Sequence, residues 1–370
     1  MLASKALADH QQAPREVASS LPEATHVFAP PSAEDAADIL RSATDERATV
    51  LFYGHGTRQG LGAPFRPDVV MSTTRMNRIV AWEPDDLTLA VEPGASVRDV
   101  EAELATRNQT AGLPEWDDAG TIGGVVATGS SGYRRARLGP TRDRLLEVEI
   151  VTGDGRLVHG GGRVVKNVSG YDLPRLAAGS MGRLGLLSSV CFKLWPLPEA
   201  AATIELDMPP AVVARRLYRP LAVLESRTSS TAMVQGTSAE VAAQSKAAGG
   251  TARDGLHWPA SPRASFTCSL RLSPSDLVAA VGRLPESWDF VAQHGVGVID
   301  AACVRPDPDD IQSLRNWAEQ RGGALVVSEP GGMEIDPWGR LPEALDLQRR
   351  VIAGFDPYGI ANPGRLPGGI

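Results

Sequence analysis

The sequence predicts an α+β protein made of two units, and three observations support this fold class. Short strand-like runs and short helical runs alternate along the 370 residues. The composition changes at residues 196–202, where prolines close a strand, and a second pattern of strands and helices begins at Thr203. Glycine is concentrated in residues 120–140, at a density that a single turn does not need.

Hydrophobic periodicity and turn residues place the elements of the first unit. The expected helices cover residues 34–47, 95–107 and 172–180. The expected strands cover residues 48–54, 68–73, 78–83, 87–93 and 185–198, with a hairpin over 145–161 that turns at Asp154 and Gly155. Ser96 precedes Asp99 by three residues, a weak variant of the capping box that starts the second of these helices.

The second unit shows its own alternation. Its expected strands cover residues 203–208, 265–272 and 324–330, and its expected helices cover 210–218, 274–284 and 310–322. A last helix over 341–355 and an extended tail over 356–370 follow. The sequence shows no recognisable internal repeat or low-complexity segment. The alternation indicates a separate α+β unit after residue 202.

Composition and charge restrict the function classes. A formal net charge of −7 gives no reason to expect a nucleic-acid partner, although a short basic run occurs at 134–137. The three cysteines, Cys191, Cys268 and Cys303, form no C-x-x-C pair, so neither a disulfide framework nor a zinc or iron–sulfur site is expected. No signal peptide or membrane span is recognisable. We therefore expect a cytoplasmic protein without direct membrane insertion, held at a membrane at most through partners.

The segment "FYGHGTRQGLG" (52–62) follows an expected strand and has two possible interpretations. A dinucleotide fingerprint G-x-G-x-x-G starting at Gly54 requires glycine at position 59, where Gln59 stands, and a Walker lysine is also missing. Glycines nevertheless allow successive backbone N–H groups to point outward, so residues 54–57 can form a concave nest for a pyrophosphate. The alternative is a plain surface turn.

The second glycine-rich segment, "GTIGGVVATGSSG" (120–132), combines glycine with other small residues. Such a surface allows a bulky planar ligand to approach the backbone without meeting side chains. The alternative is a tightly packed cluster of turns without a ligand. The arginines that follow, Arg134, Arg135 and Arg137, are more often a solvated face than a site.

Three ordered blocks identify a family resemblance. The blocks "GTIGGVVATGSSG…RLGPTRDRLLEVEIVTGDG", "GRVVKNVSGYDLPRLAAGSMGRLG" and "FDPYGIANPGR" resemble the vanillyl-alcohol oxidase or PCMH family, and within it the FAD-binding subunits of glycolate oxidases. The resemblance implies a PCMH-type FAD-binding domain of two α+β subdomains and a second, ferredoxin-like α+β cap domain. It implies an N-terminal extension (1–24), the FAD-binding domain (25–202), the cap (203–345) and a segment that returns to the FAD-binding domain (346–370).

The family motifs also imply which residues contact FAD. The pyrophosphate loop corresponds to Tyr53, Gly54, His55, Gly56, Thr57 and Arg58. The residues that line the phosphates and the ribityl chain correspond to Thr121, Ile122, Gly123, Gly124, Thr128, Gly129 and Ser130. Gly139 and Asp143 match a further "G…D" step, the backbone of Gly185 and Leu186 is expected to meet the adenine, and Asn362 and Arg365 match the tail that returns towards the flavin.

One departure from the family concerns how the cofactor is held. Some relatives attach FAD covalently through a histidine in an R-G-G-G-H-S loop, and the position of that histidine is Thr57 here. We therefore expect non-covalent FAD. His55 replaces the middle glycine of the loop, where it bends the loop, donates to a phosphate or is a plain surface histidine.

Five other polar residues are interpreted mainly as structural. In the "KN…GYD" pattern, a structural role is favoured over a chemical one for Lys166, Asn167 and Tyr171, with Asn167 holding a turn and Tyr171 packing under the cofactor. His294 is expected to be a hydrogen-bonded histidine of the second unit, and His257 a loop residue.

The catalytic residues cannot be identified from the sequence. Hydride transfer from a 2-hydroxy acid requires a cation for the carboxylate and a base or a metal for the hydroxyl proton. The six histidines show no metal-ligand spacing, and electrons leaving the flavin need a partner or oxygen. The first hypothesis is an FAD-binding subunit of a glycolate oxidase, which converts glycolate to glyoxylate with a catalytic FAD subunit and an iron–sulfur subunit. A flavin-carrying relay subunit and a self-sufficient hydroxy-acid oxidase are the alternatives.

Overall fold

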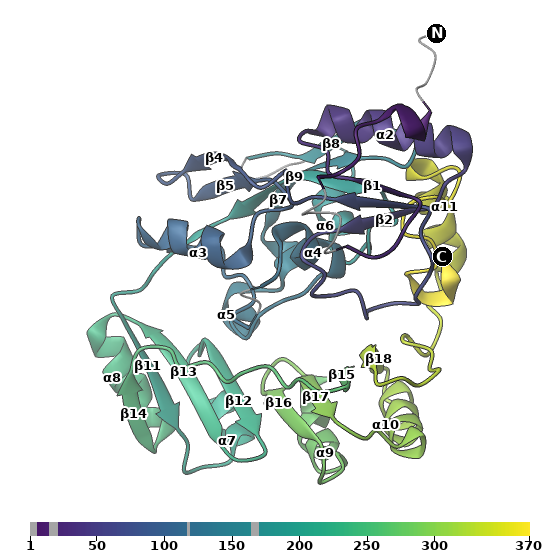
Figure 1. Ribbon diagram of the computed structural model, residues 1–370. Coiled ribbons are helices and arrows are strands. Elements are labelled where there is room, and N and C mark those ends of the chain that lie inside the picture. The colour runs from purple at the N-terminus through teal and green to yellow at the C-terminus, as the bar shows by residue number, and fades with distance from the viewer. Residues whose placement is uncertain (1–5, 15–20, 117–118, 164–169) are drawn as a thin grey trace.

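In the computed structural model, the described residues are 6–14, 21–116, 119–163 and 170–370, and they form two α+β units that face each other. The first unit lies at the top of Figure 1 and contains most of the chain before residue 200 together with the C-terminal segment. The second unit lies below it and is built on one large sheet. The α+β fold class is therefore confirmed.

The first unit begins with a small parallel sheet of three strands in the order β1 (His26–Phe28), β3 (Val69–Ser72) and β2 (Val50–Tyr53). Helix α2 (Ala33–Glu46) covers this sheet, and its N-cap hydroxyl, Ser32 Oγ, accepts a bond of 3.1 Å from the amide of Asp35. The short helix η1 (Leu7–Asp9) packs beside it through Leu7. The expected helix and two of these strands are confirmed, whereas the three-residue strand β1 was not predicted.

The second half of the first unit is a five-stranded antiparallel sheet. Its strands, in spatial order, are β4 (Ile79–Glu83), β5 (Thr88–Val91), β9 (Leu186–Lys193), β7 (Leu145–Val151) and β8 (Leu157–Gly161). The smaller elements are α3 (Val97–Ala105), β6 (Gln109–Thr110), α4 (Ile122–Thr128), α5 (Arg135–Leu138), η2 (Thr141–Asp143), α6 (Leu173–Ala177) and β10 (Trp195–Pro196). The predicted N-cap of α3 is confirmed, because Ser96 Oγ accepts a bond of 3.0 Å from the amide of Asp99.

The glycine-rich segment is not the flat bed that the sequence suggested. Residues 122–128 form helix α4, which Thr121 caps by accepting a bond of 3.2 Å from the amide of Gly124. Gly129 ends the helix in the left-handed conformation at φ 64°. Glycine inside a helix is less favourable than alanine by about 1 kcal/mol, so helix propensity did not predict α4.

The second unit consists of two βαββαβ repeats joined into one eight-stranded antiparallel sheet. The first repeat contains β11 (Ala200–Glu205), α7 (Pro210–Arg216), β12 (Ala222–Ser226), β13 (Ser230–Gly236), α8 (Ser238–Ala248) and β14 (Thr251–Asp254). The second contains β15 (Phe266–Arg271), η3 (Pro274–Asp276), α9 (Leu277–Val281), β16 (Asp289–Gln293), β17 (Val298–Cys303), α10 (Pro308–Glu319) and β18 (Ala324–Pro330).

The strand order 14-11-13-12-16-17-15-18 shows that the two repeats meet where β12 pairs with β16. Each repeat alone has the strand order of a ferredoxin-like unit. The sequence-based statement that no internal repeat exists is therefore wrong for the topology. The repeat was missed because β12, β13, α8, β14, β16 and β17 were not predicted.

The two faces of the large sheet have different environments. On β15, Phe266, Cys268 and Leu270 belong to the core shared with α9 and α10. The alternate residues of this strand point to the opposite face, which looks toward the first unit. Tyr133 of the first unit packs on that face against residues such as Leu224 and Val291.

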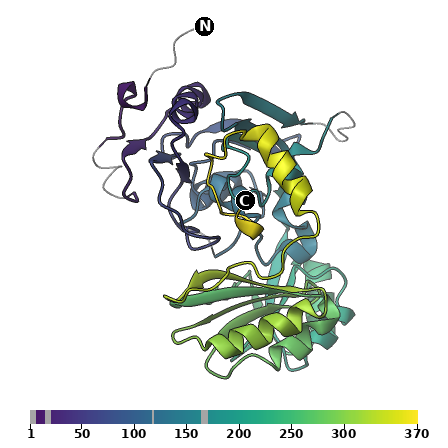
Figure 2. The same cartoon turned by 90° about the vertical axis from the view of Figure 1, so that its right-hand side faces the viewer.

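The C-terminal segment crosses back to the first unit, as the yellow part of the chain in Figure 2 shows. Helix α11 (Leu345–Phe355) places Ile352 in the core of the five-stranded sheet. Ala361 then forms a parallel bridge with Val50 of β2, and the short helix η4 (Pro367–Gly369) closes the chain.

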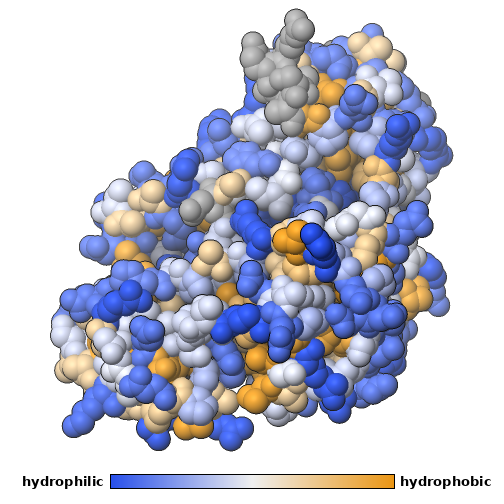
Figure 3. Space-filling view, turned by 60° about the horizontal axis from the view of Figure 1, so that its bottom comes forward, coloured by the Kyte–Doolittle hydropathy of each residue, from blue (hydrophilic) through white to orange (hydrophobic). Residues whose placement is uncertain are grey.

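On the face drawn in Figure 3, hydrophobic residues occur in small groups between hydrophilic ones. Within the described ranges, no helix combines the length and the apolar character needed to cross a bilayer.

Candidate functional site

Four segments that are distant in sequence enclose a narrow cavity of about 100 Å³ in the first unit. They are the loop after β2, the start of α4, the turn before β9 and the C-terminal tail. The predicted cofactor residues that line it are Tyr53, Gly54, His55, Gly56, Thr57, Arg58, Thr121, Gly123, Gly124, Thr128, Gly185, Leu186, Asn362 and Arg365. The structure thus brings the two glycine-bearing segments together, as the interpretation of the sequence required.

The loop after β2 has the geometry of an anion-binding nest. No backbone N–H group of His55, Gly56 or Thr57 has a hydrogen-bond partner among the described residues. Gly56 has φ 75°, and a β-carbon there would overlap the Tyr53 hydroxyl. A β-carbon on Gly54 would overlap the Thr121 hydroxyl of the facing segment. The turn thus has free backbone N–H groups and no space for further side chains. Such a turn is suited to binding a phosphate group.

The start of α4 does not supply the converging donors that the sequence suggested. The amide of Ile122 donates to Ala95 O at 2.9 Å, and that of Gly123 donates to Pro93 O at 2.8 Å. The amide of Gly124 is bound by the Thr121 cap. This segment therefore contributes a close-packed wall, and the free donors come from the loop after β2.

Side-chain bonds hold this loop against the neighbouring segments. Arg58 Nε donates to Ser130 Oγ at 3.0 Å, and Ser130 Oγ is 2.7 Å from Thr128 Oγ1. His55 Nδ1 donates to the carbonyl oxygen of Ala119 at 3.0 Å. Of the alternatives for His55, the structure supports the one in which it shapes the loop.

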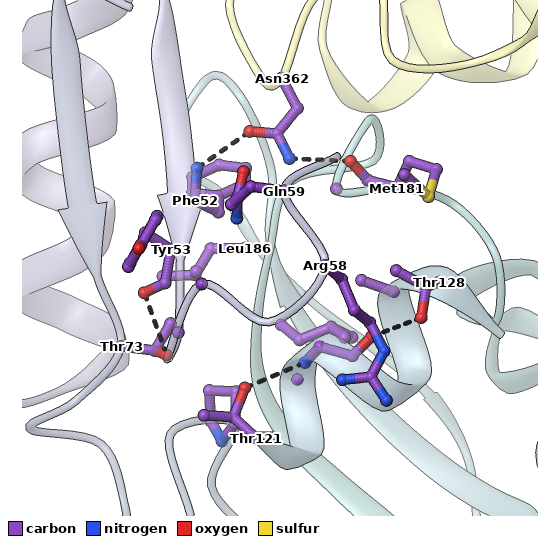
Figure 4. A pocket seen from close by; sticks show the side chains of 18 of the residues that line it. Phe52, Tyr53, Arg58, Gln59, Thr73, Thr121, Thr128, Met181, Leu186 and Asn362 are labelled. Atoms are coloured by element: carbon purple, nitrogen blue, oxygen red, sulfur yellow. Dashed lines mark hydrogen bonds between the residues drawn. The ribbon is translucent and has the colours of Figure 1, made fainter. Parts of the chain in front are cut away.

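Asn362 and Arg365 fasten the C-terminal tail to the cavity wall. The Asn362 side chain accepts from the amide of Phe52 at 2.9 Å and donates to Met181 O at 2.8 Å, as Figure 4 shows. Arg365 Nη1 donates to the carbonyl oxygens of Gln59 and Leu61 at 2.7 and 2.8 Å. Burial lowers the pKa of Arg365 from its ordinary value. Both side chains therefore form their hydrogen bonds with other parts of the protein.

A buried ion pair that the sequence reasoning missed supports the same tail. Arg183 Nη1 lies 3.0 Å from Asp356 Oδ2, and Asp356 also accepts from the amides of Ile360 and Ala361, at 3.0 Å each. Asp356 is 2% exposed, so its charge is compensated entirely inside the protein. The only signal in the sequence was its place at the start of the closing motif.

The side chains or residues at four singled-out positions, Ile122, Gly139, Asp143 and Tyr171, do not line the narrow cavity. The Ile122 side chain is fully buried in the core of the first unit. Gly139 and Asp143 line neither this cavity nor the neighbouring one, and Asp143 accepts from Arg175 at 3.0 Å. Tyr171 is 91% exposed, so the expectation that it packs under the cofactor is wrong. Lys166 and Asn167 lie outside the described residues.

A wider cleft of about 630 Å³ opens between the two units. Thr57, Arg58 and Thr128 line both cavities, so the narrow cavity leads into the wide cleft. Gly129 and Ser130, also predicted to contact the cofactor, line the wide cleft. Its far wall is the large sheet, with Thr267, Ser269, Arg271, Gln293, Asp300 and Ser328.

The wide cleft is basic. Its charged lining residues are Arg58, Arg135, Arg142, Arg263, Arg271, Asp300 and Glu329. Burial raises the pKa of Asp300, and the neighbouring Ser269 hydroxyl and the Arg271 guanidinium oppose that effect. Burial also lowers the pKa of Arg135 and of Arg271. The sequence reasoning missed Arg271, Gln293 and Asp300, although polar residues at alternate positions of "SFTCSLRL" indicated one non-core face.

The remaining histidines have structural partners. His294 Nε2 lies 2.7 Å from Glu225 Oε2, which confirms the expected hydrogen-bonded histidine. His257 Nε2 lies 2.9 Å from Asp254 O at the surface. Within the described parts of the chain, no group of three or more His, Cys, Asp or Glu residues is placed to hold a metal ion.

Comparison with known proteins shows what the first unit is similar to. Residues 24–161 match the FAD binding domain family. The chain is 32% identical to glycolate oxidase subunit GlcD of Bacillus subtilis over 191 residues, which are 50% of this chain and 39% of that protein. It is 33% identical to glycolate oxidase subunit GlcE of Escherichia coli over 172 residues, which are 46% of this chain and 49% of that protein. The aligned regions thus span less than half of the length of either relative.

A solved structure resembles both units together. An alkyldihydroxyacetonephosphate synthase superposes on 91% of this chain and 75% of its own, with a TM-score of 0.68 and 15% identity. At this identity the likeness concerns the fold, which is shared across the first unit and the large sheet.

Proposed function

Because residues 24–161 are an FAD-binding domain, we propose that this chain binds FAD along the two joined cavities and takes part in oxidising a small 2-hydroxy acid. The observation that carries the proposal is the continuity between the nest of free amides at 55–57 and the basic cleft between the units. A dinucleotide with an anionic centre and a planar reactive end fits such a path.

The residues fit the parts of FAD in a definite order. The pyrophosphate lies on the amides of His55, Gly56 and Thr57, and Arg58 adds a positive charge at the junction of the cavities. The lining of the wide cleft would hold the flavin ring, which when bound would supply the hydride acceptor for substrate oxidation. Thr57 lacks the imidazole through which some relatives bind flavin covalently, so FAD would be held without a covalent bond at this position.

The finer proposal is an FAD-binding subunit of a glycolate oxidase, which converts glycolate to glyoxylate with a catalytic FAD subunit and an iron–sulfur subunit. Two relatives named as glycolate oxidase subunits support it. Oxidation by this chain alone is a second candidate, because the wide cleft presents unpaired cationic groups of its own. A subunit that only relays electrons is the third.

Anaerobic reduction separates these candidates. The purified holoprotein is mixed with glycolate or D-lactate without oxygen, alone and together with its partner subunits, and flavin absorbance is followed. Bleaching only with partners supports the glycolate oxidase subunit, and bleaching of the chain alone supports self-sufficient oxidation. If this flavin is bleached under neither condition, the chain does not oxidise these acids and the relay role is favoured. A protein that folds but binds no FAD contradicts the whole proposal.

A further inference from the structure

We propose that the sheet wall of the wide cleft is the substrate site, where Arg135 and Arg271 bind the carboxylate of a 2-hydroxy acid and Asp300 accepts its hydroxyl proton. This inference rests on the proposed function and goes beyond it, since it assigns catalytic and binding residues that the sequence left unknown. The site is divided between the units, because Arg135 belongs to α5 and the other residues belong to the large sheet.

The register of the large sheet places the groups on one face. Asp300 of β17 pairs directly with Ser269 of β15, and Arg271 follows two positions later on the same face. Gln293 of β16 pairs with Val298, which is two positions before Asp300. All of these side chains except that of Val298 are polar, on a face that turns toward the first unit. Arg135 completes the group from across the cleft.

Three polar groups of this site, the two guanidinium groups and the Gln293 side-chain oxygen, have no hydrogen-bond partner among the described residues. Neither the Arg135 nor the Arg271 guanidinium forms a hydrogen bond or an ion pair with a described residue. Gln293 is 2% exposed, and its Oε1 atom has no hydrogen-bond partner in the part of the chain that the structure describes. Its Nε2 atom is 3.4 Å from Asp300 Oδ2. Buried polar atoms are rarely left unpaired, so the Gln293 Oε1 atom indicates a ligand that donates a hydrogen bond here, and the two neighbouring guanidinium groups indicate that the same ligand carries an anionic acceptor.

The charges of the site favour a monoanion with a hydroxyl group. Asp300 is faced by Arg271 and Ser269 from β15, by Gln293 from β16 and by Arg135 from α5. Two guanidinium groups around one carboxyl group leave a positive charge, which a substrate carboxylate neutralises. The unpaired Gln293 Oε1 accepts a hydrogen bond that an all-acceptor anion such as phosphate in its fully ionised form cannot give.

The proposed oxidation is balanced in atoms and electrons. The Asp300 carboxylate would take the proton of the C2 hydroxyl group. The hydrogen on C2 would leave with both electrons of the C2–H bond, as a hydride, and bound flavin would be the oxidant that receives it. The electron pair of the former O–H bond forms the C2=O bond, so a 2-oxo acid results and its carboxylate stays on the arginines. Burial raises the pKa of Asp300, which makes its carboxylate a stronger base than an exposed one.

The binding half of the proposal is tested by titration calorimetry on the FAD-loaded protein with oxalate, an unreactive anion that has a carboxylate group for the arginines but no hydroxyl group for Gln293. We expect Arg271→Met and Arg135→Met each to weaken oxalate binding at least ~10-fold, while the ratio of FAD to protein is unchanged. Arg271→Lys is expected to restore part of the affinity. The matched control is Arg253→Met, at an exposed arginine on β14 of the same sheet. Equal oxalate affinity in wild type and in both methionine variants overturns the site.

The proton-transfer half is tested by the rate of anaerobic flavin reduction as a function of pH. We expect Asp300→Asn to reduce the rate ~100-fold or more and to remove the acid limb of the pH profile, while oxalate binding persists. A wild-type pH profile in Asp300→Asn would overturn the role of this residue. If no 2-hydroxy acid reduces wild-type flavin under any condition, the proposed function fails, and the oxalate titration still decides the anion site independently.

Discussion

The backbone N–H of Phe52 donates a 2.9 Å hydrogen bond to the side-chain oxygen of Asn362, 310 positions further along the chain. Asn362 also donates to Met181 O and has φ 43°, a conformation that asparagine tolerates better than most residues. One 7% exposed side chain therefore joins the strand before the amide nest, the turn before β9 and the tail. The shape of the narrow cavity depends on this junction.

We expect Asn362→Ala to lower the free energy of unfolding by about 1–3 kcal/mol, because buried backbone groups at Phe52 and Met181 lose their partner. FAD affinity is expected to fall as the loop after β2 loosens. Urea denaturation and the ratio of flavin to protein after gel filtration measure the two effects. Asn316→Ala, at an exposed site on α10, is the control and should change stability by less than ~0.5 kcal/mol. Unchanged stability and flavin content in Asn362→Ala would contradict this role.

Many residues that line the narrow cavity were predicted from the sequence, because glycine and other small residues mark segments whose backbone another group can approach closely. Glycine at positions 54 and 56 and small residues around Thr121 are visible without a structure, and those segments do meet. The sequence could not predict which backbone N–H groups at the cavity are free to bind an anion. Whether the amide of Gly123 is free depends on Pro93, which approaches from another strand connection.

The residues of the proposed substrate site were not found from the sequence for a different reason. Gln293 and Asp300 lie in segments that were not predicted as strands, since glycines at 295 and 297 separate two short apolar runs. Their proximity to Arg135 results from the packing of two units, which no periodicity in the sequence records. The eight-stranded sheet likewise follows from the pairing of β12 with β16, a contact between two repeats whose sequences do not visibly repeat.

Gly124 tests the position of the cofactor with little disturbance of the fold. A β-carbon there would lie 3.3 Å from Thr121 Oγ1 and 3.6 Å from Arg58 Nη1, so the backbone can accept a side chain whose methyl groups then fill the cavity. We expect Gly124→Val to fold but to lose FAD, measured by flavin absorbance and circular dichroism. Gly354→Ala, on α11 with open space around it, is the control. A folded Gly124→Val variant with stoichiometric FAD would mean that the cofactor lies elsewhere.

Asp68 links stability to pH at the entrance of β2. Its Oδ2 atom accepts from the amide and the hydroxyl of Thr49 at 2.8 and 2.7 Å, and these bonds lower the pKa of Asp68 from its ordinary value of 3.8. Because the folded-state pKa is the lower one, the stabilisation is complete above the unfolded value and is lost as the pH falls through the folded value. We expect Asp68→Asn to cost less than ~1 kcal/mol at pH 7, measured by urea denaturation.

The control for this pH effect is Asp86→Asn, at an exposed turn between β4 and β5. As the pH falls below the lowered folded-state pKa of Asp68, wild type and Asp68→Asn should approach equal stability, because the carboxyl group is then protonated in both folded and unfolded chains. A difference between them that persists unchanged at acid pH would show that the ionised carboxylate is not the stabilising form.

We expect FAD to be attached non-covalently, because Thr57 stands where covalently flavinylated relatives carry a histidine and the amides beside it are free to bind a phosphate. If only hydrogen bonds, charge and packing hold the cofactor, acid that unfolds the chain must release it. We expect trichloroacetic acid to leave all flavin fluorescence in the supernatant, and a denaturing gel to show no fluorescent band. Thr57→His is the informative variant, since it restores the histidine of the covalent relatives at a residue that lines both cavities. Flavin that precipitates with the wild-type chain would require a covalent bond to some other residue and would remove the argument based on Thr57.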